Sequence, residues 1–281
     1  MDALVSTSWL ASELGHADLR VLDCTVLLAP RPGGGYAVES GRAAWEEAHI
    51  PGSAFADLAA DLSDPHSPLR FTLPTPERFA EAMGALGVGD GHRVVLYDSR
   101  VNMWAARVWW MLRAFGFDSA AVLDGGWRAW TTDGRPTSTE AADWPPATFT
   151  ARPRPGLFVG KEMVQAAVAS GQTCLVNALD RAQHRGDTQP YARPGHIAGS
   201  TNVPAMELVD EATHRYRPLD ELRTAFADVA RRGERVITYC GGGIAASSDA
   251  FVLHLLGHDD VAVYDNSLSE WAADPNLPME T

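Results

Sequence analysis

Two stretches of the chain match each other: Arg93-Val94-Val95-Leu96-Tyr97-Asp98 and, 142 residues later, Arg235-Val236-Ile237-Thr238-Tyr239-Cys240. Each is a short apolar run with β-branched residues, which is typical of a buried β-strand. A segment repeated within one chain indicates a duplicated domain. The copies differ where the strand ends, since Asp98 in the first half corresponds to Cys240 in the second.

Other segments repeat in the same order. His49-Ile50-Pro51-Gly52-Ser53 returns as His196-Ile197-Ala198-Gly199-Ser200, at an offset of 147 residues. The remaining pairs are 20–24 with 173–177 and 122–130 with 263–271. Because the order is preserved, two copies of one domain are the simplest explanation.

The length of 281 residues accommodates two domains of ordinary size. We predict one copy at residues 1–135 and the other at residues 157–281. The segment between them, 136–156, contains five prolines and no hydrophobic periodicity. We therefore expect it to be an extended linker.

An amphipathic pattern follows each of the two matching strands. Apolar residues recur with helical spacing over residues 103–115 and 247–256. Gly116 and Gly257 follow these segments, as is common where a helix ends. The alternation predicts an α/β fold in each domain, with a mostly parallel sheet and helices on both faces. Ligands bind such sheets at the carboxyl ends of the strands, which is where Cys240 lies.

The charge of the chain limits its partners. The formal charge is −13 and the sequence pI is about 5.0, so we expect neither nucleic acid nor a membrane surface as a partner. Hydrophobic residues make up 46% and charged residues 21% of the chain, which rules out disorder throughout. A small anionic substrate would need local positive potential, from backbone N–H groups or a few arginines.

The three cysteines, Cys24, Cys174 and Cys240, are too few and too far apart for a disulfide framework or a zinc knuckle. The first residues lack the pattern of a signal peptide, and no apolar run is long enough to span a membrane. We therefore expect a cytoplasmic location, and neither a metal nor a cofactor. Cys24 and Cys174 adjoin corresponding strands and are interpreted as core thiols.

A glycine-rich turn follows the second matching strand. It consists of Cys240, Gly241, Gly242, Gly243, Ile244 and Ala245, with a helix expected from about Ser247. Glycines without β-carbons let successive backbone N–H groups point at one position, and a helix N-terminus adds partial positive charge. Both effects stabilise a thiolate, so Cys240 is predicted to be a nucleophile. The alternative is a buried structural thiol beside a flexible turn.

Four features together point to a family: the tandem repeat, the two His-Ile-x-Gly-Ser segments, the loop at 240–245, and Asp265-x-Ser267-x-x-Glu270-Trp271. In these the chain resembles the two-domain rhodanese-type sulfurtransferases over nearly its whole length. The resemblance implies that Cys240 takes sulfane sulfur from thiosulfate or 3-mercaptopyruvate as a persulfide. It then passes the sulfur to a thiophilic acceptor, either cyanide or a thiol such as that of a thioredoxin-like protein. The first domain is implied to be inactive because of Asp98.

The loop sequence bears on the sulfur donor. A loop with basic residues after the cysteine is similar to the thiosulfate-using members, whereas Cys-Gly-Ser-Gly-Val-Thr-Ala is similar to the mercaptopyruvate-using ones. The loop of this chain is closer to the second, although Gly242 replaces the serine and Ala245 the threonine. The mercaptopyruvate-using enzymes also use an aspartate and a histidine of the first domain. Asp57 matches the aspartate, but the histidine position falls near Phe71, with His66 a few residues away. Both donors stay open, because sulfite leaves thiosulfate without a proton, whereas the enolate from mercaptopyruvate needs one.

Arg185 and Arg193 match the family segment that binds the carboxylate or sulfonate of the donor. A planar guanidinium suits a bidentate oxyanion. The competing interpretation is a solvated charge, or an ion pair with Asp180 or Asp187. The resemblance implies a substrate-binding role for both arginines, together with the loop and Asp57.

Two other functions compete with sulfur transfer. Cysteine phosphatases of related fold use a Cys-x5-Arg loop, but the position that would hold the arginine is Ala246. A non-catalytic rhodanese-like sulfur carrier or interaction module fits the first domain, with its Asp98. The cysteine loop of the second domain favours an enzyme.

Overall fold

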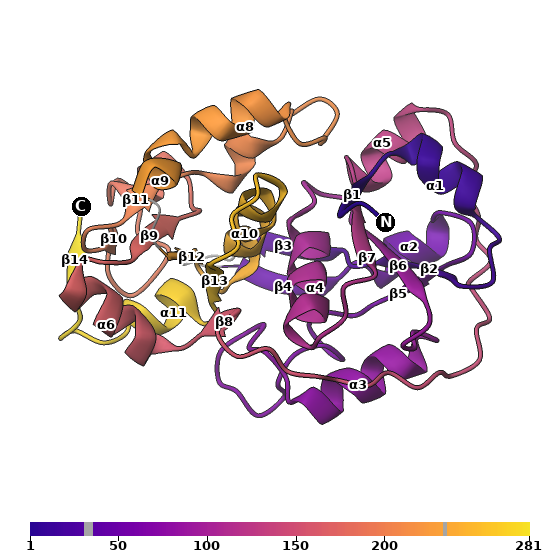
Figure 1. The fold of residues 1–281 in the computed structure, drawn as a ribbon, viewed down its shortest axis with the longest axis horizontal. Coiled ribbons are helices and arrows are strands. Elements are labelled where there is room, and N and C mark those ends of the chain that lie inside the picture. Colours follow the sequence, from indigo (N-terminus) through magenta and orange to yellow (C-terminus); the bar gives the residue numbers. More distant parts are fainter. Residues whose placement is uncertain (31–35, 233–234) are drawn as a thin grey trace.

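The computed structural model describes residues 1–30, 36–232 and 235–281. Two α/β lobes lie side by side, with the N-terminus in one and the C-terminus in the other (Figure 1). The first lobe contains a five-stranded parallel sheet in the order β1-β7-β6-β2-β5. Its strands are β1 (Leu4–Val5), β2 (Leu19–Asp23), β5 (Ser53–Phe55), β6 (Arg93–Tyr97) and β7 (Ala120–Leu123).

The second lobe repeats this sheet strand for strand. Its parallel order is β8-β13-β12-β9-β11. The strands are β8 (Phe158–Val159), β9 (Cys174–Asn177), β11 (Thr201–Asn202), β12 (Val236–Tyr239) and β13 (Val261–Tyr264). The predicted duplication and the parallel α/β class are confirmed.

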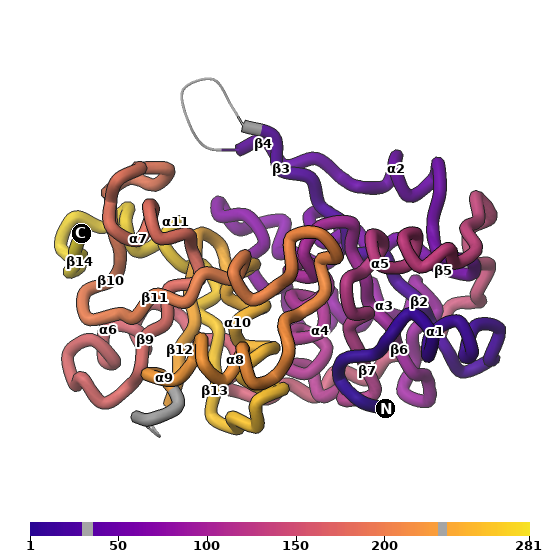
Figure 2. Tube along the Cα trace, turned by 90° about the horizontal axis from the view of Figure 1, so that it is seen from above, coloured from indigo at the N-terminus to yellow at the C-terminus, as the bar shows by residue number. Residues whose placement is uncertain are grey.

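Two short antiparallel pairs lie outside these sheets. One is β3 (Val26–Pro30) with β4 (Tyr36–Ser40), and the other is β10 (His196–Ile197) with β14 (Met279–Glu280). In Figure 2 the β3–β4 pair stands out from the body of the first lobe. It has no counterpart in the described part of the second lobe, so the duplication is not complete.

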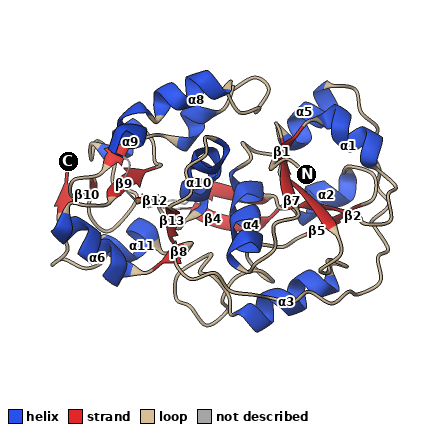
Figure 3. Ribbon diagram, in the orientation of Figure 1, coloured by secondary structure: helices blue, strands red, loops and turns tan. Residues whose placement is uncertain are grey.

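Helices flank both sheets (Figure 3). Those of the first lobe are α1 (Thr7–Glu13), α2 (Arg42–Glu47), α3 (Pro76–Ala85), α4 (Met103–Ala114) and α5 (Gly126–Thr132). Those of the second are α6 (Lys161–Ser170), α7 (Arg181–His184), α8 (Leu219–Ala225), α9 (Ala227–Arg232), α10 (Ile244–Leu255), α11 (Ser267–Trp271) and the 3-10 helix η1 (Ala205–Leu208). Along β6, Val94 and Leu96 join one hydrophobic cluster and Val95 and Tyr97 another. Both faces of the sheet are therefore covered, as predicted.

The predicted helices are α4 and α10. Gly116 and Gly257 both have φ of 86°, and each follows its helix directly after the capping residue, as expected. The predicted start of the second helix near Ser247 is wrong, because α10 begins at Ile244. Gly243 is left-handed and caps the helix, so the glycine loop is shorter than expected.

The two lobes share a hydrophobic core. Helices α4 and α10 pack against each other, and the Trp109 ring meets Phe251 edge-on at 4.9 Å between centroids. One cluster of buried residues includes both Val94 of β6 and Val236 of β12. Because separating the lobes would expose this cluster to water, they behave as one body.

The chain between α5 and β8 runs extended along the first lobe (Figure 1). The Arg152 N–H donates to the Phe115 carbonyl (2.7 Å). The buried Phe149 ring packs near Phe79 and Phe117, at 5.6 and 5.5 Å between centroids. This connector is held in place by the first lobe. In the described residues, no helix is long and apolar enough to cross a membrane.

Candidate active site

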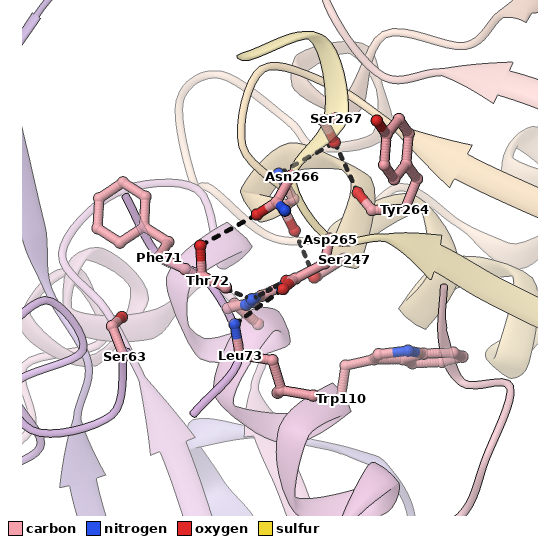
Figure 4. A network of polar contacts seen from close by, with 12 residues as sticks. Ser63, Phe71, Thr72, Leu73, Trp110, Ser247, Tyr264, Asp265, Asn266 and Ser267 are labelled. Carbon is pink, nitrogen blue, oxygen red and sulfur yellow. Dashed lines mark hydrogen bonds and ion pairs between the residues drawn. The ribbon is translucent and has the colours of Figure 1, made fainter. Parts of the chain in front are cut away.

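Cys240 lies at the carboxyl end of β12 and is 3% exposed. The Ser267 hydroxyl accepts hydrogen bonds from the N–H groups of Cys240 (3.1 Å) and Gly243 (3.2 Å), and it donates one to the Tyr264 carbonyl (2.7 Å). Figure 4 shows Ser267 beside Tyr264. The Leu268 N–H also binds the Cys240 carbonyl (3.0 Å). The start of α11 therefore holds the loop in a defined shape, unlike a flexible turn.

Gly243 occupies a place in the loop that suits only glycine. Its φ is 76°, and a β-carbon there would lie 2.6 Å from the Asp265 carbonyl oxygen and 2.8 Å from Nη1 of Arg107. The next residues, Ile244 and Ala245, form the first turn of α10. Backbone N–H groups in a first turn have no acceptor within the helix, so they can bind an anion.

The corresponding loop of the first lobe shows what this geometry binds. Asp98 follows β6 and is fully buried. Its carboxylate accepts four backbone hydrogen bonds, from Arg100 (2.8 Å), Asn102 (3.2 Å), Trp104 (3.0 Å) and Ala105 (3.0 Å). Burial raises the pKa of the Asp98 carboxyl, and these four hydrogen bonds counteract part of that rise. The Asp98 loop is thus an anion-binding cradle, filled by its own side chain.

The Cys240 loop is one residue shorter than the Asp98 loop, because Gly243 stands three residues after Cys240 and Asn102 four residues after Asp98, but both loops enter their helices through a left-handed residue. Asn102 has φ of 66° and precedes α4, as Gly243 with φ of 76° precedes α10. The N–H groups of Trp104 and Ala105, which bind Asp98, therefore correspond to those of Ala245 and Ala246. These two groups can bind an anion at Cys240, whereas the Gly243 N–H, the counterpart of the Asn102 N–H, donates to Ser267.

Replacing Asp98 with asparagine is expected to destabilise the protein by about 2 kcal/mol, because an amide keeps one acceptor oxygen and leaves two of the four N–H groups unpaired. Urea unfolding followed by tryptophan fluorescence measures the loss. Asp90→Asn is the control, since the exposed Asp90 carboxylate also accepts a backbone hydrogen bond, from Thr150 (2.8 Å). Equal losses in the two variants would contradict the cradle.

Each lobe covers the loop of the other through the same contact. Asp265, after β13, accepts a hydrogen bond from the Leu73 N–H of the first lobe (2.8 Å; Figure 4). Asp124, at the corresponding place after β7, accepts one from the Tyr216 N–H of the second lobe (2.9 Å). The same contact is therefore made twice, once in each direction between the lobes, so an approximate twofold relation connects them.

Phe71 and His214, two residues before these donors, also correspond, with φ of 62° and 58°. Phe71 faces the Cys240 loop, because a β-carbon on Gly242 would lie 4.0 Å from its ring. His214 lies at the Asp98 loop, where it hydrogen-bonds to the backbone of Arg100 and its carbonyl accepts from the Asn102 amide (2.8 Å). The Phe71 ring thus covers the cysteine loop, and the His214 imidazole covers the Asp98 loop.

Neither Asp57 nor His66 forms a hydrogen bond or ion pair with residues 240–246 in the described part of the chain. The Asp57 carboxylate accepts from the Ala60 N–H (3.0 Å) and the Ser40 hydroxyl (2.9 Å). His66 is exposed. The substrate-binding role of Asp57 stays a prediction.

Arg185 directly follows α7, with its side chain 59% exposed. Its guanidinium donates to the Asp187 carboxylate at 2.6 and 3.0 Å. This ion pair lies in solvent, where such pairs are weak. The substrate-binding role of Arg185 stays a prediction.

Arg193 is engaged differently. Its guanidinium donates to four backbone carbonyls, those of Trp271 (3.1 Å), Ala272 (3.0 Å), Asp274 (2.6 Å) and Leu277 (2.8 Å). These bonds attach the segment that carries Arg193 to the end of α11 and to the chain that follows it. Any role of Arg193 in binding the donor stays a prediction.

Arg107 is a site residue that the sequence did not indicate. It is a fully buried residue of α4, and its Nη2 donates to the Phe71 carbonyl (2.6 Å) and to the Asp265 carboxylate of the other lobe (2.5 Å). Its Nη1 lies against Gly243 and has no hydrogen-bond partner in the described residues. A cation from the first lobe thus lies directly behind the cysteine loop.

The other two cysteines are buried, as predicted for core thiols. Cys24 is 0% and Cys174 is 1% exposed. Burial raises the pKa of the Cys24 thiol well above its usual range. In the described ranges of the chain, no cluster of three or more His, Cys, Asp or Glu side chains is suited to a metal ion.

Comparison with known proteins matches both lobes to one family, since a rhodanese-like domain is recognised over residues 6–133 and 166–274. The chain is 36% identical to the thiosulfate sulfurtransferase of Rattus norvegicus and 35% identical to the 3-mercaptopyruvate sulfurtransferase of Homo sapiens. Each alignment covers 96% of this chain and 91% of the relative. The solved 3-mercaptopyruvate sulfotransferase SseA from Escherichia coli superposes with a TM-score of 0.83 at 31% identity, covering 96% of this chain and all of the other. The chain therefore belongs to the two-domain rhodanese family of sulfurtransferases.

Proposed function

We propose that this protein moves sulfane sulfur from thiosulfate to a thiophilic acceptor through a persulfide on Cys240. The observation that carries the proposal is the Asp98 carboxylate, held by four N–H groups in the duplicate of the Cys240 loop. Two of these N–H groups, those of Trp104 and Ala105, have counterparts in Ala245 and Ala246 at the start of α10, which can bind an anion where the strand ends. On Cys240 that anion is first the thiolate and then the terminal sulfur of the persulfide.

The reaction needs two displacements at sulfur. The Cys240 thiolate attacks the outer sulfur of thiosulfate, the S–S bond of thiosulfate breaks, and sulfite leaves with its electron pair. Cyanide or an acceptor thiolate then attacks the terminal persulfide sulfur, which breaks the new S–S bond and regenerates the thiolate. No proton has to be delivered to the departing sulfite.

Phe71, the residue that covers the cysteine loop, supports thiosulfate over 3-mercaptopyruvate as the sulfur donor. The latter donor leaves as an enolate, which must be protonated to become pyruvate. Phe71 faces Gly242 across the loop, so neither an imidazole nor a loop hydroxyl stands at that place. We expect a higher kcat/KM with thiosulfate, and a higher value with 3-mercaptopyruvate would overturn this assignment.

Intact mass spectrometry tests the persulfide. After incubation with thiosulfate and removal of the donor, the protein should gain the mass of one sulfur atom, and cyanide should remove it with formation of thiocyanate. A protein that gains no mass from either sulfur donor would refute the proposed function. The result does not depend on knowing the physiological acceptor.

Arg185→Ala is expected to raise the KM for thiosulfate about tenfold with little change in kcat, because a charge-assisted contact to the anion is lost from the bound state. Steady-state kinetics measures this split. Arg181→Ala is the control, since Arg181 is equally exposed, at 58%, and pairs with the Glu207 carboxylate at 2.6 Å. Equal increases in KM for the two variants would show that the effect comes from general surface charge and not from a contact between Arg185 and the donor.

The cellular setting is part of the proposal. All three cysteines are free thiols, which suits the reducing cytoplasm. A thiol acceptor, such as a thioredoxin-like protein, would have to reach Cys240 at the loop between the two lobes. Arg193 donates to carbonyls of the last residue of α11 and of the chain after it, and it is assigned to holding this face of the site in place.

A further inference from the structure

A tyrosine from the segment between Arg185 and Arg193, Tyr191, lies against the cysteine loop. A β-carbon built on Gly241 would overlap the Tyr191 hydroxyl and would lie 2.6 Å from Cζ of its ring. The hydroxyl therefore stands directly over the residue that follows Cys240. Gly241 is the loop position that makes room for it.

The Tyr191 ring packs against the second lobe, whereas its hydroxyl makes no hydrogen bond to the described residues. The ring packs against the hydrophobic cluster of the second lobe that contains Tyr239 and Trp271. Two residues further on, the Arg193 guanidinium fastens the segment to four carbonyls. Among the described residues the hydroxyl has no hydrogen-bond partner, so its donor is available to a ligand in the loop.

Three ionisable groups face Tyr191. A charge on Cys240, Tyr36 or Asp180 raises its pKa, in addition to the larger effect of burial. The phenol therefore keeps its proton at neutral pH and can donate a hydrogen bond.

The geometry points to Tyr191 as a further active-site residue, whose hydroxyl donates a hydrogen bond to the sulfur anion on Cys240. This inference rests on the proposed function and adds a residue to its site. It also accounts for the composition of the loop. Gly242 and Ala245 carry no hydroxyl, and Tyr191 supplies a hydroxyl from another segment, next to Gly241.

Tyr191→Phe tests the inference because it removes only the hydroxyl. The first measurement is the rate of alkylation of Cys240 by iodoacetamide as a function of pH, without any sulfur donor. A hydrogen bond to a charged group contributes enough to move the midpoint of this profile upward by about one pH unit. The second is steady-state kinetics with thiosulfate, in which kcat should fall about tenfold while KM changes less than about twofold.

Tyr36→Phe is the matched control, since it removes a hydroxyl from an exposed tyrosine whose charge also acts on Tyr191. An unchanged alkylation profile in Tyr191→Phe, or an equal shift in Tyr36→Phe, would overturn the inference. A rescue variant adds Gly242→Ser to Tyr191→Phe, because a β-carbon on Gly242 meets only ordinary contacts of 3.8 and 4.0 Å. The new serine hydroxyl should reverse part of the shift in the alkylation profile.

The alkylation profile separates this inference from the proposed function. If the wild type forms no persulfide but Tyr191→Phe still shifts the profile, the sulfur chemistry fails and the contact stands. If the persulfide forms and the profile does not move, the proposed function stands and Tyr191 only packs against the loop.

Discussion

Cys240→Ser is expected to abolish sulfur transfer, with a loss of kcat/KM on the order of a thousandfold or more. A serine hydroxyl stays protonated at neutral pH even in an anion-binding loop, and it cannot carry a sulfane sulfur. The variant should gain no mass when incubated with thiosulfate. The substitution replaces one atom at a buried position, so the fold is expected to remain intact, and circular dichroism checks this.

The control for this prediction is Cys24→Ala. Cys24 is fully buried, and burial raises the pKa of its thiol, which opposes formation of a thiolate. This variant should keep its persulfide signal and a kcat near that of the wild type. Sulfur added equally to the wild type and to Cys240→Ser would assign the nucleophile to another cysteine.

Arg107→Met is expected to destabilise the protein by about 3–5 kcal/mol. The substitution leaves the Asp265 carboxylate, only 13% exposed, without the cation of the other lobe. It also removes the donor to the Phe71 carbonyl, which helps to hold that residue in its left-handed conformation. Urea unfolding measures the free energy, and a methionine fills most of the volume, so cavity formation is a minor part of the loss.

Arg113→Met is the control for this prediction. Arg113 lies on the same helix but is 27% exposed and reaches Asp118 only at 3.6 Å, so its loss should cost about 1 kcal/mol or less. A double-mutant cycle with Asp265→Asn isolates the pair. Additive losses in the Arg107 and Asp265 variants would contradict an ion pair that joins the lobes.

The fold was largely predictable from the sequence because its signals are local. The patterns that predict the strands before Asp98 and Cys240 involve residues only a few positions apart in the sequence. The same is true of the helix ends at Gly116 and Gly257. The start of α10 was predicted three residues late, since three glycines resemble a loop in sequence. In the structure Gly243 is the helix cap, and this depends on contacts with Asp265 and Ser267 of another element.

The site was predictable only in part. Cys240 and its loop follow from residue types in sequence order. Phe71 and His214 occupy corresponding places but are different residue types. The neighbouring Leu73 and Tyr216 also correspond, and each makes its contact through its backbone N–H group. A contact made by the backbone leaves no mark on the side chain, so the repeat at these positions was invisible in the sequence.

The sequence by itself determined that one domain was duplicated, that the first copy ends its strand in Asp98, and that Cys240 precedes a glycine loop. Only the tertiary structure decided which side chains surround that loop. Arg107 reaches it from the other lobe, and Tyr191 lies over it from 49 residues earlier in the chain. Such contacts depend on how the two lobes and their segments pack, which is a property of distance in space and not of order along the chain.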